Sequence, residues 1–180
     1  MTPTLRDELL RMASADQDAR RQLDEHPRLL DGVPEMELTA SERQSLDRLQ
    51  AVDAENTTRM KTIVASHGWP GHSLVGADGA QAAWLLVQHA DRDLPFQRAC
   101  LELLSESVQA GDADAAHEAY LTDRVLVAEG KPQLYGTQFR LAADGSWEPR
   151  PLDSPEQVDV RRRRVGLESL DEYRRRFPVR

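Results

Sequence analysis

The sequence predicts a mainly α-helical protein with one small β-hairpin. Along residues 4–128, apolar residues recur at steps of three and four, which is the spacing of a helix face. Along residues 134–152 the period changes to two, around an Asp144-Gly145 pair that is typical of a hairpin turn. The chain has 180 residues, which is within the usual size of one domain.

Residues that start and stop helices set the boundaries of the predicted helices. Thr4 with Asp7, and Thr39 with Glu42, have the spacing of caps for two helix starts. The second of these helices is predicted to end before Pro70, because proline and the neighbouring glycines interrupt helical backbone. The predicted helices cover residues 4–23, 39–66, 78–91, 95–109 and 113–128, and the helix over 78–91 is apolar on all sides, as a buried central helix would be.

The rest of the chain completes one predicted domain. Pro27 and residues 31–34 interrupt the helical pattern and are interpreted as a linker. Ser154, followed by Pro155, and Ser169 begin two short C-terminal helices. The single domain over residues 1–180 is therefore predicted to contain an N-terminal helix (1–30), a helical core (39–130), a β-hairpin (131–152) and C-terminal helices (154–180).

Composition and charge restrict the classes of partner. The net charge is -8 and the pI is about 5.1, whereas nucleic-acid binding needs a basic face that displaces counterions. The arginine runs at 161–164 and 174–176 lie among acidic residues, and are interpreted as solvated helix faces with ion pairs. The chain shows neither a signal-peptide pattern nor an apolar run of membrane-spanning length. We therefore expect a cytoplasmic protein that binds neither nucleic acid nor membranes.

Polar residues interrupt two apolar helix faces. On the helix from residue 39, Asp53, Asn56 and His67 share a face with apolar residues such as Met60. On the helix from residue 113, Asp123 falls on the apolar face in the same way. A buried carboxylate or amide is costly unless it has a hydrogen-bond partner. These side chains are therefore predicted either to satisfy neighbouring polar groups of the fold or to form a functional site.

A histidine at the end of the central helix predicts proton-transfer chemistry. His89 lies in the last turn, where the helix dipole favours an imidazolium. We expect Asp53, Asn56 and Asp123 to come near this histidine when the helices pack into one core. Gln138 reaches the same place from its strand. A carboxylate beside a histidine fixes the tautomer of the ring, and the histidine exchanges protons near neutral pH.

Five short motifs follow one another within residues 53–150. They are Gly68-Trp69-Pro70, Val75-Gly76, Gln88-His89-Ala90-Asp91, Asp123-Arg124 and Gln133-x-Tyr135-Gly136-Thr137-Gln138. In this order they resemble an uncharacterised bacterial family of domains of unknown function. The resemblance transfers no mechanism, but it implies that one site contains Gln88, His89, Asp123, Arg124, Tyr135 and Gln138.

Patterns for a metal or a nucleophile are weak. His89, Asp91 and His117 match a His-x-Asp…His ligand pattern only superficially, because they fall on predicted helices. Cys100 lies among apolar residues and is interpreted as a buried thiol, and as the single cysteine it excludes an internal disulfide. Trp69 is interpreted as a core side chain, with a place beside the substrate as the alternative. No metal and no cofactor are predicted.

Two functions of different classes follow from these residues. The first is a small acid–base enzyme, most simply a metal-independent hydrolase of a small molecule or peptide, in which Asp123 or Asp91 orients His89. Its predicted substrate-binding residues are Asp53, Asn56, His67, Trp69, Gln88, Arg124, Tyr135 and Gln138. The second is a non-catalytic interaction or immunity-type module, in which the inward polar residues only fix helix packing and the hairpin edge meets a protein partner.

Overall fold

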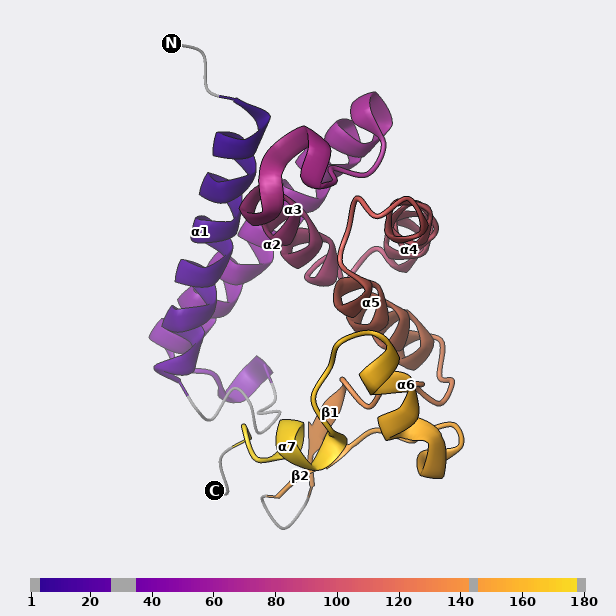
Figure 1. Cartoon of the computed structure of the whole chain (residues 1–180). Coiled ribbons are helices and arrows are strands. Elements are labelled where there is room, and N and C mark those ends of the chain that lie inside the picture. Colours follow the sequence, from indigo (N-terminus) through magenta and orange to yellow (C-terminus); the bar gives the residue numbers. More distant parts are fainter. Residues whose placement is uncertain (1–3, 27–34, 143–145, 178–180) are drawn as a thin grey trace. The chain divides into compact units, whose positions relative to one another are not determined.

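The computed structural model describes residues 4–26, 35–142 and 146–177. The described chain is mainly α-helical with one two-stranded antiparallel sheet, which confirms the predicted fold class (Figure 1). It divides into two compact units, unit 1 (Met1–Asp93) and unit 2 (Leu94–Arg180). Their boundary lies inside the helical core predicted over residues 39–130, and the single domain over 1–180 stays a prediction. None of the described helices combines the length and the apolar content needed to cross a bilayer.

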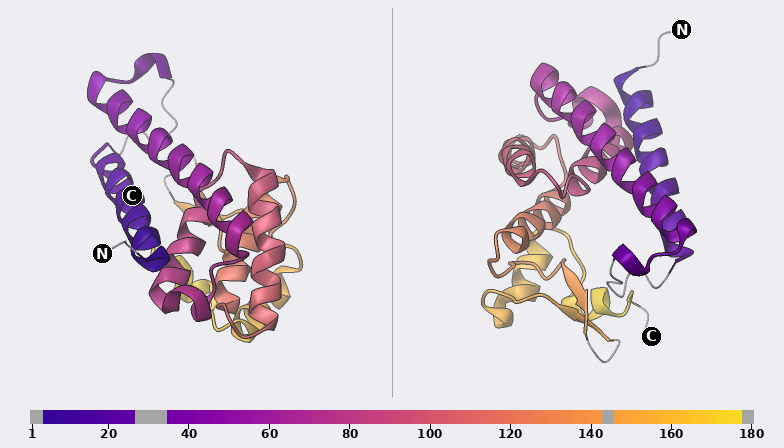
Figure 2. Two further views of the ribbon diagram at one scale, coloured as in Figure 1. Left: turned by 90° about the horizontal axis from the view of Figure 1, so that it is seen from above. Right: turned by 180° about the vertical axis from the view of Figure 1, so that it is seen from behind.

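Unit 1 is built from long packed helices. Its elements are α1 (Leu5–Asp24), the short 3-10 helix η2 (Glu35–Glu37), α2 (Ala40–His67) and α3 (His72–Gln88). Helix α1 lies alongside both α2 and α3 (Figure 1 and Figure 2). Capping boxes of Thr4 with Asp7 and of Thr39 with Glu42 form as predicted. The linker predicted around residues 27–34 lies outside the described residues.

Helix α3 supplies much of the core of unit 1. It begins at His72, earlier than predicted, and Gly76 interrupts it with φ 72° and ψ 171°. The part after Gly76 corresponds to the helix predicted over 78–91, and its Ala83, Leu86 and Val87 are buried. Gly68, with φ 71°, ends α2 where the sequence predicts the stop. The predicted helix is therefore confirmed, with a bend that the composition did not reveal. It ends at Gln88 instead of Asp91, and it is not buried on all sides, because Asp78 and Gln81 are exposed.

Unit 2 combines a helix pair with the hairpin. Its elements are α4 (Leu94–Gln109), α5 (Ala115–Ala128), β1 (Phe139–Leu141), β2 (Trp147–Pro149), η3 (Pro155–Gln157), α6 (Val158–Arg164) and α7 (Leu170–Arg174). Helix α4 packs on α5, and Phe139 pairs with Pro149 across the antiparallel strands. The rings of Phe139 and Phe177 stack with centroids 4.3 Å apart, which attaches the C-terminal segment to the hairpin. The Asp144-Gly145 turn lies outside the described residues.

Two details of unit 2 differ from the prediction. The first strand was expected over residues 134–141 but begins only at Phe139. Three of the preceding backbone N–H groups, those of Leu134, Tyr135 and Thr137, donate to the buried side chain of Asp123 instead of to a neighbouring strand. Ser154 does not cap the following helix with its side chain, because its backbone is left-handed with φ 46°. Pro155 nevertheless occupies the first turn of η3, as predicted.

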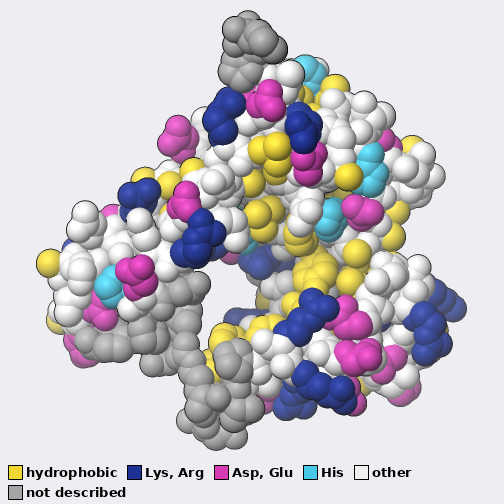
Figure 3. All heavy atoms as spheres, turned by 60° about the vertical axis from the view of Figure 1, so that its left-hand side comes forward, with side chains coloured by type: hydrophobic (Ala, Val, Ile, Leu, Met, Phe, Trp, Pro, Cys, Tyr) yellow, Lys and Arg dark blue, Asp and Glu magenta, His cyan; other side chains and the backbone are white. Residues whose placement is uncertain are grey.

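The arginine run at 161–164 is not a uniformly solvated face, which corrects that interpretation. Arg162 is 0% exposed, and Arg161 donates through Nε to the carbonyl of Leu134 at 2.6 Å. Both side chains use backbone carbonyls of nearby loops as acceptors, while Arg163 and Arg164 are exposed. On the face drawn in Figure 3, Lys and Arg side chains are interspersed with Asp and Glu. The absence of nucleic-acid binding stays a prediction.

Candidate functional site

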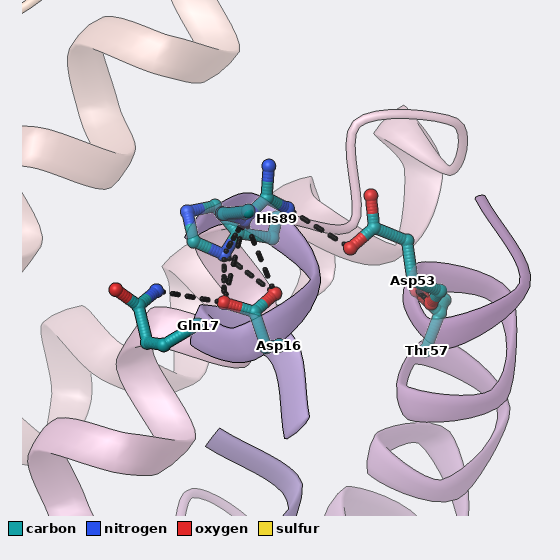
Figure 4. Close-up of polar contacts among 6 residues, drawn as sticks. Asp16, Gln17, Asp53, Thr57 and His89 are labelled. Atoms are coloured by element: carbon teal, nitrogen blue, oxygen red, sulfur yellow. Dashed lines mark hydrogen bonds and ion pairs between the residues drawn. The ribbon is translucent and has the colours of Figure 1, made fainter. Parts of the chain in front are cut away.

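A carboxylate–histidine pair joins the end of α3 to α1 in unit 1. His89 is the C-cap residue of α3, and Asp16, on α1, is 0% exposed. The ring nitrogen Nδ1 of His89 lies 2.8 Å from Oδ1 and 2.9 Å from Oδ2 of Asp16 (Figure 4). Gln17 donates a further hydrogen bond to Asp16 Oδ2 at 2.8 Å. The carboxylate in contact with the histidine is therefore Asp16, rather than the expected Asp123 or Asp91.

The contacts of Nδ1 decide which nitrogen of the ring carries the proton. Arg20 Nε lies 3.0 Å from the same Nδ1, but a ring nitrogen cannot donate to Asp16 and accept from Arg20 at once. A carboxylate only accepts, and Asp16 is the closer and more deeply buried group, so we assign the proton to Nδ1. Arg20 Nε also reaches the Asp16 carboxylate, at 3.3 and 3.4 Å. In neutral His89 this leaves a lone pair on Nε2, to which no described residue hydrogen-bonds.

Arg20 extends the pair to α2. Its Nη2 donates to Oδ1 of Asp53 at 2.9 Å, so that one guanidinium links two carboxylates on different helices. The hydroxyl of Thr57 donates to the backbone carbonyl of Asp53 at 2.7 Å, one turn earlier in α2. Figure 4 shows Asp53 approaching the cluster from α2 while Asp16 lies beneath the imidazole. Among the described residues of unit 1, the polar cluster thus connects α1, α2 and α3, the three long helices.

A pocket of about 350 Å³ opens beside this cluster. Its walls are one face of α2, which includes Gln50, Asp53 and Lys61, and residues 89–93. Lys61 forms an ion pair with Asp93 within the wall. The pocket is large enough for a small polar molecule, and both His89 and Asp53 line it.

The two carboxylates of the cluster have opposite pKa shifts. Burial acts to raise the pKa of Asp16, but the hydrogen bond from His89 and the charges of His89 and Arg20 outweigh it, so the pKa lies below its ordinary value. Burial also acts on Asp53, and there the negative charges of Asp16 and Asp91 add to it. The pKa of Asp53 is therefore raised, although Arg20 and His89 oppose the rise. Opposite pKa shifts of two neighbouring carboxyl groups are typical of acid–base sites.

Asp16→Asn is expected to lower the free energy of unfolding by about 1–3 kcal/mol at pH 7, because His89 and Arg20 lose a charged partner. The pKa of Asp16 lies lower in the folded than in the unfolded chain. Its ionised form therefore stabilises the fold above about pH 4, and this stabilisation is lost as the pH falls through the folded-state pKa. Since asparagine does not titrate, urea unfolding of both proteins at pH 7 and pH 3 should show the difference shrinking.

The matched control for this experiment is Asp18→Asn, which removes an exposed acid from the same helix. It should change the unfolding free energy by less than about 0.5 kcal/mol at either pH. A penalty for Asp16→Asn that grows on acidification would contradict an ionised Asp16 in contact with His89.

The structure brings together three of the site residues predicted in unit 1. His89, Asp53 and Asp91 line the same pocket. Asn56 is buried as predicted, but it lines a different groove, between α1 and α2. The other predicted residues of this unit do not line the pocket with His89: His67 is exposed at the end of α2, and Trp69 and Gln88 are buried.

Asp123 has its own place in unit 2. It is 0% exposed, so the predicted inward acid is confirmed. Its Oδ1 accepts the N–H groups of Leu134 and Tyr135, at 2.7 and 3.0 Å. Its Oδ2 accepts the N–H and the hydroxyl of Thr137, at 2.9 and 3.0 Å. Burial raises the pKa of Asp123 and these hydrogen bonds oppose the rise. The side chain therefore satisfies a loop, which was one of the two predicted roles.

The remaining motif residues surround that loop. The Gln138 amide donates to the Thr137 hydroxyl at 3.1 Å, and burial raises the pKa of the Tyr135 phenol. Arg124 follows Asp123 on α5 and is half-buried. The site that the resemblance implied is thus distributed over both units, with His89 and Gln88 in unit 1 and the other four residues in unit 2.

Asp16 and Arg20 were missed, although the sequence contained a signal for Asp16. The apolar face of α1 includes Leu5, Leu9 and Met12, and Asp16 continues their alternating steps of four and three. The rule that singled out Asp53 and Asp123 therefore also selects Asp16 when it is applied to the first helix. Arg20 follows one turn later and carries no comparable signal, because arginine on a helix is usually solvated.

Fold and site together define a small, mainly α protein with a buried carboxylate–histidine pair beside a polar pocket. A family of unknown function, DUF6624, matches residues 3–178, and the chain belongs to this family. This confirms the resemblance to a family of domains of unknown function. No curated protein and no solved structure matches the chain.

Proposed function

We propose that the chain is a small acid–base hydrolase in which His89, oriented by Asp16, activates a water molecule. The observation that carries the proposal is the 2.8 Å contact between His89 Nδ1 and the buried Asp16 carboxylate. A carboxylate in this position holds the neutral ring in one tautomer and stabilises the imidazolium that forms when Nε2 takes a proton. Nε2 is the nitrogen to which no described residue hydrogen-bonds.

The pocket supports water as the nucleophile. Thr57 and Thr58 line it, but their hydroxyls donate to backbone carbonyls of α2 at 2.7 and 2.9 Å. Neither hydroxyl hydrogen-bonds to a base among the described residues, whereas an activated serine or threonine nucleophile needs one. A water molecule that gives its proton to His89 is therefore the simplest attacking group. The pocket volume of about 350 Å³ favours a small substrate.

The experiment is a hydrolysis screen with matched histidine variants. The purified protein is tested on small chromogenic esters, amides, phosphoesters and glycosides, beside His89→Gln and Asp16→Asn. Loss of a general base typically costs about 10²–10⁴ in rate, so we expect His89→Gln to lower kcat at least about a hundredfold. His67→Gln replaces an exposed histidine at the end of α2 and should leave kcat unchanged.

The outcome also separates the two classes of function. Turnover that persists undiminished in His89→Gln would overturn the role of this histidine. If the screen finds no turnover, and both variants lose cooperative unfolding, His89 holds helices together instead. The interaction module predicted from the sequence would then become the function to test.

A further inference from the structure

We propose that Asp53 is the proton donor of the same pocket and protonates the leaving group while His89 activates water. This inference rests on the proposed function and adds a second proton-transfer group to it. It also defines the substrate class as small molecules whose leaving atom is an oxygen or nitrogen that must be protonated, such as esters, amides and glycosides. From the sequence, Asp53 is predicted only to bind substrate.

Asp53 lies in the same pocket as His89. It lines the pocket from α2, while His89 lines it from the end of α3. Its Oδ1 accepts from Arg20 Nη2 at 2.9 Å, and no described residue hydrogen-bonds to Oδ2. Figure 4 shows one oxygen of Asp53 joined to the cluster by a dashed line and the other oxygen turned away from that contact. The side chain is 22% exposed, which is enough for contact with a bound molecule.

Charges of both signs surround Asp53 and act on its pKa. Arg20 would ordinarily keep a neighbouring carboxylate ionised, but its guanidinium is shared with Asp16, which Nε reaches at 3.3 Å. Burial raises the pKa of Asp53, the charges of Asp16 and Asp91 add to the rise, and Arg20 and His89 oppose it without cancelling it. Asp16, in contrast, has a lowered pKa. The raised pKa of Asp53 favours its protonated form, and the lowered pKa of Asp16 favours its ionised form, which suits the roles of acid and of orienting group.

The proposed step balances without any further reactant. His89 Nε2 takes a proton from water, and the water oxygen forms a bond to the electrophilic carbon of the substrate. The bond from that carbon to the leaving oxygen or nitrogen breaks, and the leaving atom takes the proton of Asp53. The imidazolium then loses its proton and the Asp53 carboxylate regains one through solvent, so the net reaction is hydrolysis.

Two alkylating probes test this pairing without knowledge of the substrate. Glycidol, a small epoxide, alkylates His89 Nε2 by C–O cleavage, and the oxygen that is released needs a proton. Iodoacetamide alkylates the same nitrogen and releases iodide, which needs none. Labelling is measured by mass spectrometry on the tryptic peptide 62–92, in which His67 and His72 serve as internal references.

We expect Asp53→Asn to slow glycidol labelling of His89 at least about tenfold and to change iodoacetamide labelling less than about twofold. Asp47→Asn, an exposed acid on the same helix outside the pocket, should change neither rate. In the wild-type protein, the ratio of glycidol to iodoacetamide labelling should fall as the pH rises, since ionised Asp53 has no proton to give. This second measurement does not depend on the folding of a variant.

The failures of the two proposals are distinguishable. If neither probe labels His89 faster than His67 and His72, the histidine is not an accessible base, and the proposed function is overturned together with the role of Asp53. If iodoacetamide labels His89 readily but glycidol labelling depends neither on Asp53 nor on pH, Asp53 is not the proton donor and the role of His89 stands.

Discussion

Asp123→Ala should lower the free energy of unfolding by about 3–5 kcal/mol. Asp123 is fully buried and accepts the N–H groups of Leu134, Tyr135 and Thr137 as well as the Thr137 hydroxyl. Its removal leaves these backbone donors without an acceptor, and each unsatisfied buried donor costs about 1–3 kcal/mol. The loss is measured by urea unfolding at neutral pH. Amide hydrogen exchange should locate it, through faster exchange at residues 134–137 than in α1 or α2.

Two controls make this result specific. Asp171→Ala removes an exposed acid from the same unit and should cost less than about 0.5 kcal/mol. Asp123→Asn keeps one acceptor oxygen but turns an amide N–H₂ toward N–H donors, so its penalty should be close to that of alanine. A penalty below about 1 kcal/mol for Asp123→Ala would mean that water replaces the carboxylate, and that the loop is held by its other contacts.

Asp123 and Arg162 both hydrogen-bond to the backbone of Tyr135, one to its N–H group and the other to its carbonyl. Asp123 accepts the N–H of Tyr135, and Arg162 Nη1 donates to the Tyr135 carbonyl at 2.6 Å. Gln133 holds the other end of the loop, with its amide donating to the carbonyls of Gln138 and Arg150 at 2.9 and 2.8 Å. Backbone polar groups that would pair in a strand are thus satisfied by side chains. Within the motif at residues 133–138, the side chains of Gln133 and Thr137 therefore have a structural role in this loop.

The local features of the fold could be predicted because they depend on neighbouring residues. Thr4 and Thr39 form their capping boxes with residues three positions away, and the stop at Gly68 requires only its own positive φ. The first strand was predicted too long because its true length depends on a residue that is distant in sequence. Its alternation is local, but the acceptor that takes its N–H groups, Asp123, lies more than ten residues away in sequence.

The candidate site was predicted only in part, because hydropathy patterns give the face of a helix and not its neighbour. The patterns correctly placed Asp123 inside and His89 at a helix end. They could not show that the partner of His89 is Asp16, on a helix more than seventy residues away in sequence. Which buried acid meets which histidine depends on how helices pack, and the sequence of either helix alone does not contain that information.

Arg162 reverses the usual expectation for arginine, and its replacement is the second change expected to have a large effect. The side chain is 0% exposed, its Nε donates to the carbonyl of Glu168 at 2.5 Å, and its guanidinium lies 4.9 Å from the Tyr173 ring centroid. Arg162→Ala should lower the free energy of unfolding by about 3–5 kcal/mol, because a cavity forms and two carbonyls lose their donor. Urea unfolding measures the loss, and Arg163→Ala, an exposed neighbour on α6, should cost less than about 0.5 kcal/mol.

Arg162→Met separates packing from hydrogen bonding at this position. Methionine fills much of the same space but donates to neither carbonyl, so we expect a loss of about 1–3 kcal/mol, between the wild-type protein and Arg162→Ala. No described residue hydrogen-bonds to Nη2 of Arg162, so the buried charge is incompletely satisfied and carries a desolvation cost. If Arg162→Met is as stable as the wild-type protein or more so, that cost outweighs both hydrogen bonds. In that case Arg162 does not stabilise the loop that Asp123 holds from the other side.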